Sequence, residues 1–179
     1  MKRAFVLSLV LAACASAPDD GAPTSTATSR VTVAPQTTMD ITRQDEVDAV
    51  QISASRNDVW KAMLATHQSL DIPMSGSDES AHAAAFTLRD KTRTILGKPA
   101  SSYVDCGNGP AGPRADSYRI TVKISHRLLP VSDSSTILST LVEAWARHPG
   151  QSADAIQCNS RSTLEKYLAG IITTRATTK

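Results

Sequence analysis

The chain has few aromatic side chains. Only 4% of its 179 residues are aromatic, with two Phe, two Trp and three Tyr, whereas Ala is frequent. A domain of this composition has either a small, tight core or a partly hollow one, and the sequence leaves both open. Beyond residue 14, no apolar stretch reaches the ~18 residues that a membrane-spanning helix needs, which excludes such a helix from that part of the chain.

The chain also has no large excess of one charge. It has 19 Lys and Arg residues against 17 Asp and Glu residues, and Lys2 and Arg3 supply the difference. Proteins that bind nucleic acid carry a basic patch that neutralises phosphates. The balance of charge therefore excludes nucleic acid as an expected partner.

The first 14 residues resemble a bacterial lipoprotein signal. Lys2 and Arg3 precede an apolar run of about ten residues, which is too short to cross a bilayer. The run ends in Leu11-Ala12-Ala13-Cys14, a sequence similar to a lipobox, in which the cysteine thiol receives a diacylglycerol. The alternative is an ordinary cleaved signal followed by a chance cysteine. We expect residues 1–13 to be removed and the lipid on Cys14 to anchor the chain to a membrane. Ala15 after the cysteine favours the outer membrane, with the protein facing the periplasm.

Residues 14–45 are predicted to be a linker. They are rich in Ala, Thr, Ser and Pro, and they bury too little apolar surface to offset the entropy of ordering them. Val31 and Val33 alternate with polar neighbours, a pattern that allows one short edge strand. Residues 46–174 then have the length of one domain, and residues 175–179 form a tail.

Capping signals predict two amphipathic helices. Ser55 and Asp58 have the spacing of a capping box and begin a helix over residues 57–70, which Pro73 follows. Ser162 and Glu165 repeat this spacing before a second helix near the C-terminus. Apolar residues recur at helical spacing in both segments: Val59, Trp60, Met63, Leu64, His67 and Leu70, then Leu164, Leu168, Ile171 and Ile172.

Between these helices the sequence pattern has a period of two. The alternation is clearest over residues 118–125, and residues 136–147 fit a strand that is apolar on both faces, with a turn at 130–135 between them. Weaker strands fit residues 47–53 and 83–94. Since the short link favours an antiparallel hairpin, we expect an α+β fold in which an antiparallel sheet packs against one or two helices, in the order β-α-β-β-β-α.

Two cysteines remain once Cys14 is assigned to the lipid. In an oxidising compartment we expect Cys106 and Cys158 to form a disulfide. A redox-active or metal-binding pair is the alternative, but the chain has no CxxC and no adjacent His to supply further ligands.

Few motifs carry chemistry. Residues 107–112 spell GxGxxG, yet Pro110 and Pro113 interrupt the string and a strand follows it, so we interpret it as a loop. No serine lies in a GxSxG turn, and the four histidines have no metal-ligand spacing: His67, His82, His126 and His148. The sequence therefore predicts no catalytic residue, no metal and no cofactor.

The overall pattern resembles one known family. The lipobox, the leader, the helix start Asn57-Asp58-Val59-Trp60, the multistrand middle and the closing helix at Ser162-Thr163-Leu164-Glu165 are similar to BamC-like envelope lipoproteins. The resemblance covers about residues 47–174. It implies a helix-grip fold, in which an antiparallel sheet grips a long helix, and an accessory part in outer-membrane protein assembly. This chain has room for one such domain, whereas the family's member has two.

Two functions fit these observations. The first is a non-catalytic interaction or scaffold module that docks another envelope protein. The second is a carrier or sensor of a small apolar or lipid-like ligand between helix and sheet. An enzyme is the third alternative, although no spacing in the chain predicts a convergent polar cluster. For the first function we expect a groove between helix 57–70 and the sheet, with Trp60, Met63 and His67 as its residues. A filled core with an exposed apolar patch favours the module, and an open apolar cavity favours the carrier.

Lipidation gives the first testable prediction. Cys14→Ser removes the thiol that takes the lipid, so the variant should escape processing at this site and shift its phase in a detergent-partition assay. The wild-type chain, expressed in its own host, is the reference. Its recovery in the aqueous phase would contradict the prediction.

Overall fold

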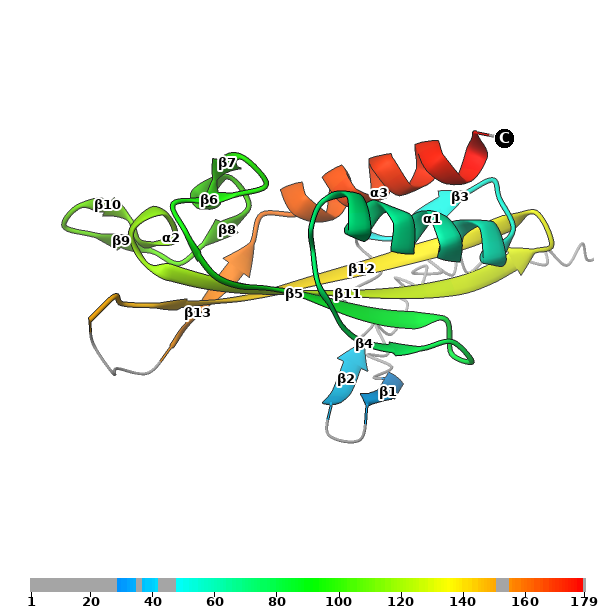
Figure 1. The fold of residues 1–179 in the computed structure, drawn as a ribbon, viewed down its shortest axis with the longest axis horizontal. Coiled ribbons are helices and arrows are strands. Elements are labelled where there is room, and N and C mark those ends of the chain that lie inside the picture. Colours follow the sequence, from blue (N-terminus) through cyan, green and yellow to red (C-terminus); the bar gives the residue numbers. More distant parts are fainter. Residues whose placement is uncertain (1–28, 35–36, 42–47, 151–154, 179) are drawn as a thin grey trace, which may run out of the picture.

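The computed structural model describes residues 29–34, 37–41, 48–150 and 155–178 (Figure 1). The predicted signal peptide, Cys14 and much of the predicted linker lie outside these residues. The described part has an α+β fold, as the sequence predicts. It has three α-helices and a seven-stranded sheet, more of both than predicted. No helix in it is long and apolar enough to cross a membrane.

The strands of the sheet are joined by antiparallel pairing throughout. One edge of the sheet is β4, and β3 pairs with the end of β12 that β13 leaves uncovered. From edge to edge the order is β4 (Met74–Asp78), β5 (Ala83–Thr92), β11 (Arg119–Ser132), β12 (Ser135–Arg147), β13 (Ile156–Ser160) and β8 (Val104–Asp105), with β3 (Val50–Ile52) beside β12.

The long hairpin of β11 and β12 forms the centre of the sheet. Alternate residues of β11 are buried on one face: Ile120, Val122, Ile124, His126 and Leu128. The hairpin turn is tighter than predicted, because Ser132 pairs with Ser135. Pro130 lies within β11 rather than in the turn, which the chain tolerates because β5 pairs with β11 only as far as Arg127 and the register shifts after Pro130.

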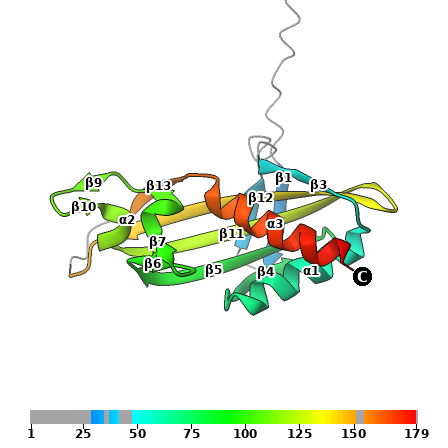
Figure 2. The ribbon, with the colours of Figure 1, turned by 90° about the horizontal axis from the view of Figure 1, so that it is seen from above.

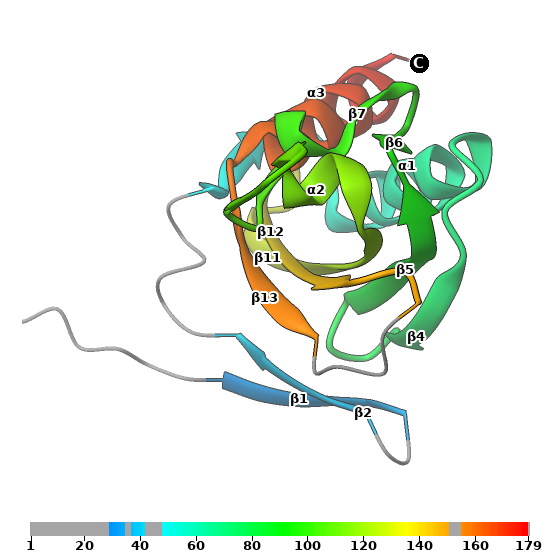
Figure 3. The same ribbon diagram turned by 90° about the vertical axis from the view of Figure 1, so that its left-hand side faces the viewer.

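Two long helices, α1 (Arg56–Ser69) and α3 (Thr163–Thr177), lie side by side on one face of the sheet (Figure 2). Seen end-on, the sheet curves below both of them (Figure 3). In α3, three of the four predicted apolar residues are completely buried: Leu164, Leu168 and Ile172. The helix continues to Thr177, so it extends into the segment predicted as a tail.

The two predicted capping boxes have different outcomes. Ser55 caps α1 as predicted: its hydroxyl oxygen accepts from the backbone N–H of Asp58 at 3.2 Å and donates to the Asp58 carboxylate at 2.7 Å. The prediction at the second helix is wrong. Ser162 has a φ of 55° and its hydroxyl donates to Asp48 at 2.9 Å instead. Glu165 is buried, accepts a hydrogen bond from the Ser160 hydroxyl, and has its pKa raised by that burial.

The observed order of elements is longer than the predicted β-α-β-β-β-α. The sequence predicts neither the edge strand β4 nor β13. The segment between β5 and β11 also folds into short elements: β6 (Thr94–Ile95), β7 (Lys98–Pro99), η2 (Ala100–Ser102), β8, β9 (Asn108–Gly109), β10 (Gly112–Pro113) and α2 (Arg114–Ser117). Asp116 holds this segment together, since its carboxylate accepts from the backbone N–H and the hydroxyl of Ser101 at 2.8 and 2.6 Å.

A separate hairpin lies within the predicted linker. β1 (Ser29–Ala34) pairs with β2 (Thr37–Ile41), so this part of the linker is not continuous coil. The alternation at Val31 and Val33 and the neighbouring Thr residues favour extended chain, which explains the difference. The hairpin lies near β4 and β5, on the side of the sheet away from α1 and α3 (Figure 3).

Cys106 and Cys158 form the predicted disulfide, with their Cα atoms 4.3 Å apart. The bond links the segment after β8 to β13, at the edge of the sheet opposite β4. An ion pair between Arg161 and Asp105, at 3.0 Å, joins the same two regions.

Removing the disulfide should destabilise this end of the molecule. The bond spans 52 residues, and the chain-entropy treatment of a loop of that size gives about 4 kcal/mol at most. We expect Cys106→Ser/Cys158→Ser to lower the free energy of unfolding in urea by a few kcal/mol. Reduction of the wild type should reproduce this loss, and an unchanged unfolding midpoint in both would contradict it.

Candidate functional site

An apolar groove lies between the second half of α1 and the edge strand β4. Its volume is about 610 Å³. Met74 on its rim is 55% exposed, whereas Ile72 and Phe86 below are buried. Seven residues line the groove: Leu64, Gln68, Asp71, Ile72, Pro73, Met74 and Phe86.

The groove is shaped by how α1 ends. The backbone N–H of Ile72 donates to the carbonyl of His67 at 3.0 Å, and Asp71 takes a φ of 51°. This turn reverses the chain, so that Ile72 packs under the groove and Pro73 leads directly into β4. The carbonyl of Pro73 accepts from the N–H of Thr87 at 2.9 Å, which ties the turn to β5.

The strand beside the groove is the outermost strand of the sheet. β4 pairs with β5 on one side, and no described strand pairs with its other side. Met74 pairs with Phe86 across the two strands, and the register shifts between Met74 and Gly76. An unpaired strand edge offers backbone N–H and C=O groups to another extended chain.

Phe86, in the floor of the groove, stacks on the buried ring of His67. The two ring centroids lie 3.6 Å apart at an interplanar angle of 16°. The Nε2 atom of His67 lies 3.2 Å from Nε2 of His126, and both histidines have no solvent exposure. The floor therefore rests on a buried polar pair.

The hydrogen bonds of this pair fix its tautomers. Nδ1 of His67 lies 3.0 Å from the carbonyl of Met63, which can only accept, so this nitrogen donates. Nε2 of a neutral His67 then accepts from Nε2–H of His126. Nδ1 of His126 accepts in turn from the hydroxyl of Thr140, at 3.0 Å. Donation runs in one direction, from the sheet to α1, and both rings are neutral.

Burial keeps these rings neutral. Desolvation lowers the pKa of His67 to about 4, against a smaller opposing effect of the Met63 carbonyl. The pKa of His126 is also lowered, first by burial and then by the neighbouring His67. Solvent does not reach either ring, so the pair is part of the buried core.

The predicted groove residues occupy the core and not the groove. Trp60, Met63 and His67 lie on the buried face of α1, with exposures of 8%, 0% and 0%. Leu64 and Gln68, on the next stripe of the same helix, line the groove instead. The region between α1 and the sheet is thus filled, and the hollow lies at its edge.

The other sequence motifs are not brought together with the groove. The GxGxxG string forms the small hairpin of β9 and β10, and the four-residue helix α2 follows it directly, where the sequence predicts a strand. His82 contacts Trp60 and His148 contacts Tyr118, so these histidines lie apart from each other. Among the residues that the structure describes, no three His, Cys, Asp or Glu side chains are grouped to hold a metal ion.

Comparisons with known proteins do not assign this site. No protein-family model and no curated protein matches the chain. The site is therefore interpreted from its own geometry.

The buried histidine pair gives a prediction for pH dependence. The unfolded chain takes up protons on these rings below pH 6.5, whereas folded His67 does so only near pH 4. The free energy of unfolding should therefore fall as the pH is lowered from 6.5 to 4, by about 3 kcal/mol for His67 alone.

The test compares urea unfolding at pH 7.5 and 4.5. His67→Gln/His126→Gln keeps an amide donor and acceptor at each position but removes the titration, so its loss on acidification should be smaller than that of the wild type. His148→Gln, remote from the pair, is the control. If the wild type, the double variant and His148→Gln all lost the same unfolding free energy on acidification, the buried pair would not be the cause.

Proposed function

We propose that this chain is a non-catalytic interaction module, tethered to the envelope membrane by a lipid on Cys14, whose α1–β4 groove docks an extended segment of another envelope protein. The observation that carries the proposal is the combination of an apolar groove with an unpaired strand edge at Met74. A part in outer-membrane protein assembly fits the resemblance to BamC-like lipoproteins with a helix-grip domain.

The arrangement suits a peptide that adds a strand to the sheet. In such recognition, backbone hydrogen bonds to the free edge supply affinity, and pockets for alternate side chains supply specificity. The edge of β4 offers the backbone groups, and the groove beside it offers room for large apolar side chains. The filled core favours this interpretation over a ligand enclosed between helix and sheet, because Met63, Ile124 and Val59 leave no exposed surface there.

A carrier of a small apolar ligand is the second candidate. The groove volume of about 610 Å³ is within the range of small-molecule sites, and its lining is mostly apolar. Native mass spectrometry of protein purified from the envelope separates the two. A co-purified lipid-sized mass that is lost in Leu64→Gln would favour the carrier.

The docking proposal predicts a position-specific effect of one charge. Met74→Glu places a carboxylate on the groove rim, where a bound apolar segment would have to desolvate it, so partner binding should weaken at least about tenfold. Val131→Glu is a matched control, since Val131 is 54% exposed against 55% for Met74 and lies near the β11–β12 turn. Both variants should unfold at the wild-type urea concentration.

Photo-cross-linking measures the contact directly. A cross-linking amino acid at position 74 of the full-length chain, irradiated in cells, should join a discrete envelope protein, whereas the same group at position 131 should not. Equal cross-linking from both positions, or unchanged partner recovery with Met74→Glu, would overturn the docking proposal.

A further inference from the structure

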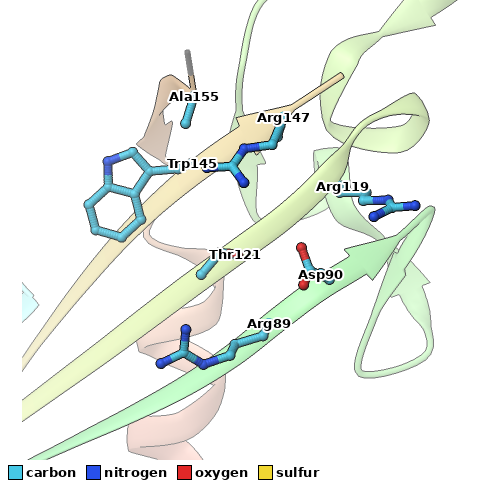
Figure 4. Close-up of a pocket in the computed structure, with 7 residues that line it drawn as sticks. All are labelled: Arg89, Asp90, Arg119, Thr121, Trp145, Arg147 and Ala155. Atoms are coloured by element: carbon cyan, nitrogen blue, oxygen red, sulfur yellow. The ribbon is translucent and has the colours of Figure 1, made fainter. Parts of the chain in front are cut away.

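The face of the sheet opposite α1 and α3 has a second hollow of different chemistry. Its volume is about 300 Å³. Three arginines, one on each of three neighbouring strands, lie around it: Arg89 of β5, Arg119 of β11 and Arg147 of β12 (Figure 4). Four other residues complete the lining: Asp90, Thr121, Trp145 and Ala155.

The strand register concentrates positive charge here. Arg119 and Arg147 pair directly across β11 and β12, and like charges placed opposite each other destabilise a sheet. Both salt bridges seen among the described residues lie elsewhere, between Lys123 and Glu143 and between Arg161 and Asp105. Asp90 is the one acid in the lining, so the hollow has three guanidinium groups against one carboxylate.

A β-bulge places both Arg89 and Asp90 beside the hollow. Lys91 pairs with Ile120 and Leu88 pairs with Val122, so both Arg89 and Asp90 lie opposite Thr121. Asp90 takes a φ of 48°, which is uncommon for a residue other than glycine. Bulges of this kind redirect side chains and are frequent beside functional sites.

The chemistry of the hollow indicates its ligand. A guanidinium group presents a planar fork of donors that matches the oxygens of a phosphate, and it stays charged at all physiological pH values. All three arginines are exposed, and half-buried Trp145 adds a flat, amphipathic surface beside them. We propose that this hollow is a binding site for a terminal phosphate that can carry two negative charges, either the phosphate monoester of a lipid headgroup or free inorganic phosphate. The site lies on the other face of the sheet from the groove, so the inference is independent of the proposed docking function.

Calorimetric titration of the full-length protein in neutral detergent tests the site. The probes are short-chain phosphatidic acid, short-chain phosphatidylcholine and inorganic phosphate. We expect phosphatidic acid to bind and phosphatidylcholine to bind at least about tenfold more weakly. Binding of inorganic phosphate with equal affinity would identify free phosphate as sufficient, and much weaker binding would identify the lipid headgroup as the source.

Substitutions then locate the site. Arg119→Gln or Arg147→Gln should weaken phosphatidic acid binding about tenfold or more, and Arg119→Lys, which keeps the charge but not the fork, should have a smaller effect. Arg127→Gln makes the same charge change eight residues further along β11, on the same face, and should leave binding unchanged.

A thermal readout separates binding from structure. Because Arg119 and Arg147 repel each other, Arg119→Gln should melt at the wild-type temperature or higher without ligand, and it should lose the rise in melting temperature that phosphatidic acid gives the wild type. The proposal would be overturned if neither phosphatidic acid nor inorganic phosphate bound. The proposal would also be overturned if Arg127→Gln lost as much phosphatidic acid binding as Arg119→Gln. The same holds if Arg119→Gln had a lower melting temperature than the wild type and still bound phosphatidic acid.

Discussion

The pairing of β11 with β12 decides which side chains face the helices and which face the opposite side of the sheet. Side chains alternate between the faces of a strand, so a slip of one residue in this register would turn every buried apolar group of the hairpin outward. The register turns Ile120, Ile124 and Leu128 to the buried face of the sheet. It also places Arg119 opposite Arg147 on the other face. The helices, the histidine pair and the cationic hollow all take their positions from this one alignment.

The two faces of the sheet consequently differ in character. The face toward α1 and α3 ends in an apolar groove at the β4 edge, and the other face has the arginine hollow near the ends of β5 and β12. Since the two sites share no lining residue, an extended apolar segment and an anionic group can occupy them together.

Elements with a strong local signal could be predicted from the sequence. The cap at Ser55 and the apolar stripe from Val59 onward predict α1, and the alternation of apolar and polar residues predicts β11. The strand β4 could not be predicted, because Met74-Ser-Gly-Ser-Asp has one apolar residue and no alternation. The cap at Ser162 fails because the residue adopts a left-handed conformation and its hydroxyl donates to Asp48, a contact 114 residues away.

The sites were harder to predict than the elements. The apolar stripe on α1 is visible in the sequence. Its centre faces the core and its margin faces the groove. Only the position of the sheet decides which residues of the stripe are buried and which line the groove. Phe86 and Met74 join Leu64 through β5 and the unpredicted β4. The three arginines occupy polar positions on three separate strands, where each alone is an ordinary solvent-facing residue.

The edge strand β4 has a consequence for aggregation. A long, flat, apolar edge invites copies of the same protein to pair edge to edge into a continuous sheet, and natural proteins avoid this by short, bulged or charged edges. β4 has only five residues, its register shifts after Met74, and it ends at Asp78. It is long enough to accept one short segment beside the groove, but too short and irregular to be a template for a continuous sheet. This edge is therefore a poor template for polymerisation of copies of the chain.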